Sequence, residues 1–239
     1  MSDLNDEAII AKAILEAKAR KKEIASSQID HLPREEEAVS VFMAGSPGAG
    51  KTETARRMIR DFSSESGQKL VHIENDELRK EFEDYNGQNS PLFQRPATLL
   101  VEAIHDRALK QGVSFILDST LSSLDKAKSN IERSLKRNRY VLIIFVYQSP
   151  EQAWKFVKAR EGTEGRRVPE EVFVKQFLGS QTVVSELKRY FGGQVNLTFI
   201  EKNIDGKNDR PHFNVTNIDA LFRKKYNEKM LEDLILKDK

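Results

Sequence analysis

The chain has 239 residues, 38% of them hydrophobic and 32% charged, and this size suits one α/β domain with small additions. Its 39 basic and 37 acidic side chains leave a formal net charge of +2, which provides no overall attraction for a long nucleic acid. Cysteine is absent, so disulfides, thiolate nucleophiles and cysteine-based zinc sites are excluded.

Residues 1–32 are predicted to form a helix with Ile10, Ile14 and Ala17 along one side and many charges elsewhere. Pro33 and the following acidic residues end it, so we divide the chain into an N-terminal helical extension (1–35) and a main domain (36–239). The extension is interpreted either as a helix packed on the domain or as a regulatory or partner-binding helix. We expect a cytoplasmic location, because the first residues lack an apolar signal core and no stretch approaches about 18 apolar residues.

The main domain alternates predicted strands and helices. Strands are expected at 38–45, 70–75, 113–118, 140–147 and 195–201. Helices are expected at 52–62, near 77, at 97–111, 123–138, from 150, at 170–190 and 217–236, with loops at 86–96, 161–169 and 203–212. Repeated strand–helix units predict a parallel sheet with helices on both faces, and such sheets bind ligands at the carboxyl ends of their strands.

A phosphate-binding motif lies between the first predicted strand and helix. It fits G-x-x-x-x-G-K-[ST] at every fixed position, and it consists of Gly45, Ser46, Pro47, Gly48, Ala49, Gly50, Lys51 and Thr52. Glycines let successive backbone N–H groups turn toward phosphate oxygens, and the following helix adds its positive end. Lys51 is expected to reach the β- and γ-phosphates, and the Thr52 hydroxyl to bind Mg²⁺. The alternative is a glycine-rich turn without a ligand, but the strand–loop–helix context favours a nucleoside triphosphate.

Acidic residues follow the second and third predicted strands. Strand alternation puts Glu74 and Asp76 on one face at the phosphate-binding edge. Asp76 there either accepts a proton from a substrate hydroxyl or caps the next helix, and the residues alone leave both interpretations open. Asp118 ends an apolar run and is therefore predicted to hold Mg²⁺, with a turn or cap role as the alternative.

Three further groups of polar residues are candidates. Glu102 has apolar neighbours and either points into a cleft or, as its helix position favours, lies in solvent. Arg160, Arg166 and Arg167 flank a glycine-bearing segment and predict a phosphate-binding lid near 160–169, against the alternative of a solvated basic loop. The basic cluster at 126–139 is interpreted as a solvated helix face. None of the four histidines shows metal-ligand spacing.

Together these motifs resemble the zeta toxin family of P-loop kinases. The matching pieces, within residues 40–178, are the phosphate-binding motif, I-E-N-D at 73–76, V-E-A-I at 101–104, I-L-D-S-T at 116–120, Tyr140 and Pro150 at the start of the next strand and helix, and Arg160 with G-R-R-V-P at 165–169. The resemblance implies a P-loop kinase fold and a kinase that uses ATP and Mg²⁺. Its implied acceptor is a UDP-activated amino sugar of the UDP-N-acetylglucosamine type, whose phosphorylation blocks cell-wall precursor synthesis.

The resemblance also implies roles for individual residues. Asp76 would be the catalytic base, Lys51 the γ-phosphate ligand, and Arg160 and Arg166 the groups that stabilise the transferring phosphoryl. The substrate-binding positions would be Glu74, which supports the base, together with Glu102 and Thr120, which contact the sugar. The family often has Asp where Glu74 stands and Gly where Ser119 stands, and Ser119 narrows the space beside the substrate.

Other functions stay open at this point. The chain could phosphorylate another nucleotide or cofactor, or it could be a non-catalytic regulatory module that binds ATP. Many zeta toxins pair with an antitoxin whose helix blocks the ATP site. An antitoxin is therefore one expected partner, and residues 1–32 could supply such a helix in cis.

Overall fold

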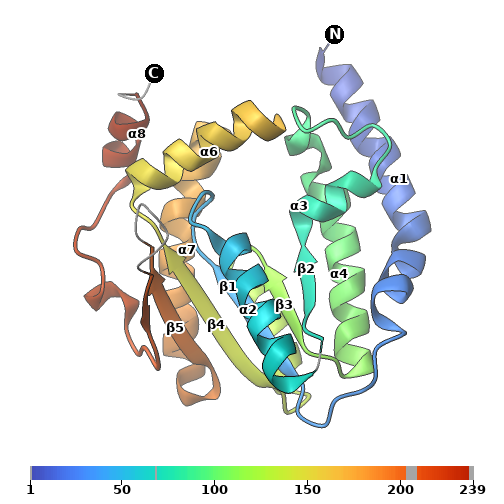
Figure 1. Ribbon diagram of the computed structural model, residues 1–239. Coiled ribbons are helices and arrows are strands. Elements are labelled where there is room, and N and C mark those ends of the chain that lie inside the picture. Colours follow the sequence, from blue (N-terminus) through green and yellow to red (C-terminus); the bar gives the residue numbers. More distant parts are fainter. Residues whose placement is uncertain (1, 68, 203–208, 237–239) are drawn as a thin grey trace.

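The computed structural model describes residues 2–67, 69–202 and 209–236, which are built around one six-stranded sheet (Figure 1). The strands are β1 (Val39–Ala44), β2 (Val71–Glu74), β3 (Phe115–Asp118), β4 (Tyr140–Tyr147), β5 (Asn196–Glu201) and β6 (Arg210–His212). Their order across the sheet is β2-β3-β1-β4-β5-β6. The first five are parallel, and β6 runs antiparallel to β5. The predicted α/β fold with a mostly parallel sheet is confirmed.

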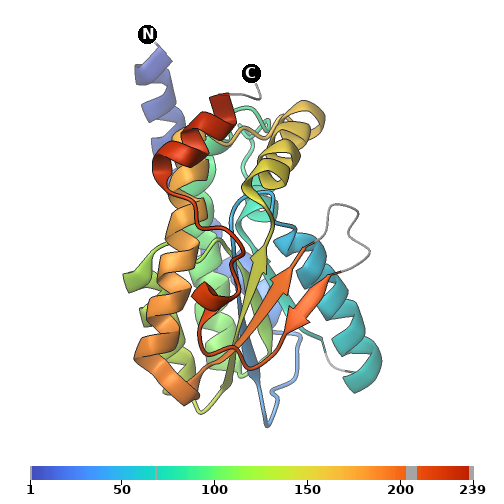
Figure 2. The same cartoon turned by 90° about the vertical axis from the view of Figure 1, so that its left-hand side faces the viewer.

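Helices cover both faces of the sheet. They are α1 (Ser2–Ile29), α2 (Lys51–Ser66), α3 (Asn75–Leu78), α4 (Gln94–Gln111), α5 (Leu124–Leu135), α6 (Pro150–Glu164), α7 (Glu170–Phe191) and α8 (Glu228–Leu236). Figure 2 shows α2 (blue-green) on one side of the sheet and α7 (orange) on the other. Within the residues that the structure describes, none of these helices combines the length and apolar character needed to cross a bilayer.

The central strand β1 is buried on both of its faces. Val41 and Met43 join the smaller apolar cluster under α2, whereas Phe42 and Ala44 join the larger cluster under α4, α5 and α7. This two-sided burial explains why the strand reads as a continuous apolar run rather than an alternating one. The carboxyl end of β1 is thereby held rigidly where the phosphate-binding motif begins.

Helix α1 packs along α4 through its small and apolar side chains (Figure 1). Ala17 and Ile29 are almost completely buried in the larger core cluster. At the surface, Asp30 pairs with Arg107 of α4, and Arg20 pairs with Glu81. The helix is therefore part of the same packed core as the sheet.

The structure differs from the sequence-based boundaries between β2 and α4. The predicted loop 86–96 contains a short 3-10 helix, η2 (Ser90–Phe93), and the first residues of α4. Pro96 lies in the first turn of α4. Proline is tolerated there because the N–H groups of a first turn have no partner within the helix.

The C-terminal region differs more. The predicted last strand, 195–201, is followed by β6, and the predicted helix 217–236 is wrong. That range instead holds a 3-10 turn, η4 (Ile218–Ala220), and the short α8. Phe222 lies between them and packs its ring against Phe199 and Tyr147, so core packing overrides the helical pattern. Asn227 then accepts a hydrogen bond from the N–H of Met230 at the start of α8.

Candidate active site

A cavity of about 500 Å³ lies at the carboxyl ends of the central strands. Its floor is the phosphate-binding loop, and its walls come from the ends of β2 and β3, from α4 and α5, and from the segment joining α6 to α7. The predicted residues of the active site that line it are Pro47, Gly48, Gly50, Lys51, Thr52, Glu74, Asp76, Glu102, Asp118, Thr120, Arg160 and Arg166. This position is where open parallel sheets bind ligands.

Glycine is required at two positions of the loop. Gly45 has φ 135° and Gly48 has φ 74°. A Cβ atom would approach the carbonyl oxygen of Val146 to 2.2 Å at Gly45, and that of Ala153 to 2.1 Å at Gly48. The loop is thus pressed against β4 and α6, in a conformation that residues with side chains rarely adopt.

Lys51 is folded back over the loop that precedes it. Its ammonium donates hydrogen bonds to the carbonyl oxygens of Gly45 (3.1 Å) and Ser46 (2.8 Å). Burial lowers the pKa of Lys51 to about 8, although the neighbouring carboxylate of Asp118 opposes this shift. The Lys51 ammonium is therefore a partly buried cation whose hydrogen bonds go to the carbonyls of the phosphate-binding loop.

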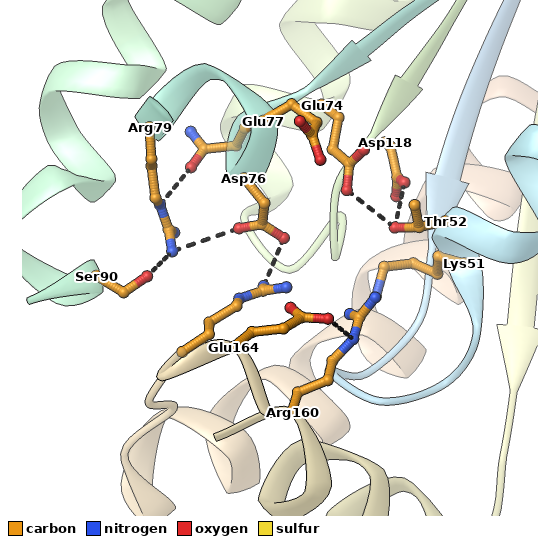
Figure 3. Close-up of polar contacts among 12 residues, drawn as sticks. Lys51, Thr52, Glu74, Asp76, Glu77, Arg79, Ser90, Asp118, Arg160 and Glu164 are labelled. Atoms are coloured by element: carbon orange, nitrogen blue, oxygen red, sulfur yellow. Dashed lines mark hydrogen bonds and ion pairs between the residues drawn. The ribbon is translucent and has the colours of Figure 1, made fainter. Parts of the chain in front are cut away.

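The Thr52 hydroxyl lies between two carboxyl groups (Figure 3). Its oxygen is 2.9 Å from Asp118 Oδ2 and 3.2 Å from Glu74 Oε1. Burial raises the pKa of Glu74, and the nearby charge of Asp118 adds to the shift. A hydroxyl, two acids and a P-loop form an oxygen-rich site of the kind that holds Mg²⁺.

His72 extends this cluster on the same face of β2. Its Nε2 is 3.4 Å from Asp118 Oδ2, and its Nδ1 is 3.9 Å from Glu74 Oε2. Burial alone would raise the pKa of Asp118, but His72, Lys51 and Thr52 together hold that pKa below its ordinary value. The sequence shows no metal-ligand spacing around His72, but the register of β2 and β3 places this histidine beside Asp118.

Asp76 is held between two arginines (Figure 3). Its Oδ2 is 2.6 Å from Arg166 Nη2, and its Oδ1 is 3.4 Å from Arg79 Nη1. The alternative role as a helix cap is wrong, because Glu74 occupies the N-cap position of α3 and Asp76 lies inside the first turn. Its carboxylate points into the cavity instead.

Arg79 was not predicted from the sequence. Its buried guanidinium also donates hydrogen bonds to Asn75 Oδ1 (3.2 Å), to Ser90 Oγ and to Gln94 Oε1. Burial lowers its pKa, and the charge of Asp76 opposes that shift. The only sequence signal was an arginine one helical turn after Asp76.

The segment that carries Arg160, Arg166 and Arg167 consists of the end of helix α6 and the connection from α6 to α7. Helix α6 continues to Glu164 and ends at Gly165 with φ 69°, so the predicted loop is wrong for residues 161–164, and Arg160 lies inside a helix. There Arg160 Nη2 is 3.5 Å from Glu53 Oε1. Arg166 and Arg167 follow Gly165 in the connection to α7, and both line the cavity.

The proposed sugar-contacting residues, Glu102 and Thr120, also line the cavity. Thr120 Oγ1 is 3.0 Å from Ser122 Oγ, and Ser119 also lines the cavity. Glu102 Oε1 is 2.8 Å from Lys126 Nζ, with both side chains 49% exposed. Glu102 therefore lies at the cavity rim, between the solvated and the cleft positions that the sequence left open.

The basic cluster at 126–139 does not form one patch. Lys126 pairs with Glu102, Arg133 pairs with Asp106, and Lys128 lies over the ring of Tyr190. Arg139 is buried, and it donates to Ser40 and to two backbone carbonyls. These cations therefore already have separate partners.

Helix α1 is not part of this site. Its packing is directed against α4, and none of its described residues lines the cavity. The expectation that this segment could block the nucleotide site in cis is therefore not met in this structure.

A model of the family described as Zeta toxin matches residues 22–210. The chain belongs to the zeta toxin family. A comparison with curated proteins gives no match.

Two solved structures show the same fold. One is from the "PezAT chromosomal toxin-antitoxin system of the human pathogen Streptococcus pneumoniae", with a TM-score of 0.62, 16% identity and 93% of each chain covered. The other, "AvrRxo1-ORF1:-ORF2 with ATP", has a TM-score of 0.60 and 16% identity, covering 95% of this chain and 71% of that one. This zeta toxin family member shares their architecture across nearly its whole length.

Proposed function

We propose that this chain is an ATP-dependent kinase that transfers the γ-phosphoryl group to a hydroxyl of a nucleotide sugar of the UDP-N-acetylglucosamine type. The observation that carries the proposal is the Asp76 carboxylate, which points into the cavity that Lys51 and the P-loop also line. ATP is further supported by the structural neighbour AvrRxo1-ORF1:-ORF2, which is a structure with that nucleotide. The sugar acceptor rests on the family resemblance.

In this proposal the phosphates lie on the P-loop amides. Lys51 leaves the loop carbonyls and pairs with the β- and γ-phosphates. Thr52 and Asp118 are the residues that would hold Mg²⁺, and their buried oxygens fit that ion. When bound, the ion supplies positive charge that neutralises the phosphates.

Asp76 takes the proton from the acceptor hydroxyl as the hydroxyl oxygen of the acceptor attacks the γ-phosphorus. The new oxygen–phosphorus bond forms while the bond to the ADP oxygen breaks, and ADP leaves with the electron pair. Negative charge spreads over the transferred group, and the guanidinium groups of Arg160 and Arg166 stabilise it. Glu74 supports the base, and Glu102 and Thr120 orient the acceptor.

A protein partner is part of the proposal. One structural neighbour comes from a toxin-antitoxin system, and the other is a structure of two components, ORF1 and ORF2. We therefore expect an antitoxin to bind this chain as a separate protein, because α1 does not occupy the cavity.

The decisive experiment is a phosphoryl-transfer assay. Wild-type protein is incubated with Mg²⁺-ATP and a panel of UDP-sugars, nucleotides and dinucleotides, and products are read by mass spectrometry as the gain of one phosphate. Asp76→Asn should lower turnover by about 10²- to 10⁴-fold while ATP affinity is kept. Glu77→Gln is the matched control, because its carboxylate is half exposed and pairs with Lys80.

Two outcomes would contradict the proposed mechanism, and a third would replace the proposed acceptor. Bound ATP with no phosphorylated product on any acceptor would favour a non-catalytic module. Equal turnover in wild type and Asp76→Asn would remove Asp76 as the base. A product made only from a nucleotide or dinucleotide would keep the kinase and replace the sugar.

A further inference from the structure

The cluster beside Thr52 contains a ligand type that a Mg²⁺ site does not need. Imidazole is a borderline-soft donor that suits first-row transition metals such as Fe²⁺, Ni²⁺ and Zn²⁺, whereas Mg²⁺ prefers oxygen and keeps several waters. His72 and Glu74 lie two residues apart on one face of β2, and Asp118 pairs with Glu74 in the register of the neighbouring strand. One side-chain nitrogen and two carboxyl groups therefore converge from two rigid strands.

The distances fit a single ion. One ligand atom from each of His72, Glu74 and Asp118 lies within 4.8 Å of the other two. Two ligands on opposite sides of one divalent ion are about 4 to 4.6 Å apart, so small side-chain adjustments complete the site. The three groups are already gathered by the backbone.

One carboxylate oxygen of this cluster has no hydrogen-bond partner. Glu74 Oε2 accepts no hydrogen bond from the protein. Water cannot readily replace that partner, because 92% of the Glu74 side chain is inaccessible to solvent. Arg56 Nη2 is 3.8 Å away, beyond hydrogen-bond distance, and its own side chain is 56% exposed. A buried acceptor without a donor is costly, and a cation bound between Glu74 and Asp118 would satisfy it.

We propose that His72 is a ligand of a divalent first-row transition-metal ion, which binds with Glu74 and Asp118 before the nucleotide arrives and for which Mn²⁺ serves as the spectroscopic probe. The proposal deepens the metal site of the proposed kinase, but it concerns binding without ATP. Two carboxylates face the ion, with the cations of Lys51 and Arg56 as the opposing charges. If phosphate oxygens of ATP supplied the remaining ligands of the ion, an imidazole ligand from the protein would not be needed.

The opposing interpretation is that His72 only orients Asp118 through a hydrogen bond. That role predicts oxygen-only coordination of any bound ion and little change in metal affinity when His72 is replaced by another hydrogen-bonding side chain. The two interpretations therefore differ in one spectroscopic property, which is nitrogen coordination.

The test uses the metal-free full chain and Mn²⁺ alone. Free Mn²⁺ is titrated by electron paramagnetic resonance, and the bound ion is examined by pulsed measurements for nitrogen coupling. We expect one ion per chain, coupling to ¹⁴N that changes to ¹⁵N when histidine is isotopically labelled, and displacement by Mg²⁺ only at about 100-fold excess. The labelling result needs no substitution, so it does not depend on a variant that folds.

His72→Gln should weaken Mn²⁺ binding at least tenfold and remove the nitrogen coupling, while Mg²⁺ affinity changes less than about threefold. His31→Gln is the control, because that histidine is exposed after α1. Absence of Mn²⁺ binding without nucleotide would overturn the proposal, and so would bound Mn²⁺ with no histidine coupling. Because no ATP or acceptor is present, neither result bears on whether the chain is a kinase.

Discussion

Arg166 Nη2 lies 2.6 Å from Asp76 Oδ2, so a residue expected to bind the transferring phosphate is paired with the expected base. The guanidinium thereby occupies a carboxylate oxygen that the proposed mechanism needs for the acceptor hydroxyl. In the proposed kinase, the γ-phosphate of ATP would compete for the same guanidinium. Binding of nucleotide would thus free the carboxylate when a phosphoryl group is present to be transferred.

Replacing Arg166 should therefore affect catalysis more than folding. We expect Arg166→Gln to lower kcat by about 10²- to 10³-fold, because transition-state charge loses a guanidinium. Steady-state kinetics and a thermal melt check this. Arg167→Gln is the matched control on the next residue and should reduce kcat less than tenfold; equal losses in the two variants would contradict the role of Arg166.

Arg79 is expected to matter for both stability and turnover. Arg79→Met leaves Ser90, Gln94 and Asn75 without their donor, and it should reduce the free energy of unfolding by about 2 to 4 kcal/mol. Urea denaturation measures this loss. Lys80→Met, at an exposed neighbour, should change it by less than about 0.5 kcal/mol.

The contribution of Arg79 to turnover can be separated from its contribution to folding by a double-mutant cycle. If Arg79 acts by positioning Asp76, its loss should change kcat far less when Asp76→Asn is already present. Equal effects in both backgrounds would mean that Arg79 serves the fold alone.

His105 should make stability depend on pH. Burial lowers its pKa to about 4, from an ordinary value of 6.5, because the ring lies among Phe42 and Phe115. The unfolded chain binds this proton more readily. The contribution of the neutral His105 ring to the free energy of unfolding is therefore fully present above pH 6.5. It is lost as pH falls toward 4, and the total loss is at most about 3 kcal/mol.

Urea denaturation at several pH values tests the role of His105. His105→Leu should flatten the stability curve between pH 6.5 and 4, and His31→Gln should leave its slope unchanged. An unchanged slope in His105→Leu would show that other groups cause the acid sensitivity.

Helix α1 should be needed for folding rather than for inhibition. Ala17 is 1% exposed in the core against α4, so Ala17→Asp should destabilise the protein by about 3 kcal/mol. Ala19→Asp places the same charge on the exposed side of the helix and should cost less than about 0.5 kcal/mol. Thermal melts compare the two variants. Higher turnover in Ala17→Asp would restore the inhibitory interpretation.

The sequence predicted that the P-loop, Asp76 and Asp118 meet at one edge of the sheet, because that placement depends on local order along the chain. A P-loop needs glycines at fixed spacing between a strand and a helix, and Asp76 and Asp118 follow strands that end at the same edge. Each of these features can be recognised from residues that are close together in the sequence. The family assignment and the α/β fold, which rest on the same motifs, were confirmed.

Residues whose partners are distant in sequence were missed. His72 joins the cluster only because β2 pairs with β3, and Arg79 is fixed by Ser90 and Gln94 in a segment that was expected to be a loop. Phe222 interrupts the expected C-terminal helix because it reaches the core beside Phe199. Such contacts depend on three-dimensional packing that a local pattern does not encode.

The cavity draws its two halves from different parts of the fold. Phosphate-side residues come from strand ends and the loop after β1, whereas the opposite wall is formed by helix side chains, among them Thr98 of α4, Asn130 of α5 and Gln176 of α7. Substitutions on those helix surfaces leave the strand ends untouched. In the proposed kinase, acceptor preference would therefore diversify, in evolution or by engineering, while the phosphate-side residues stay unchanged.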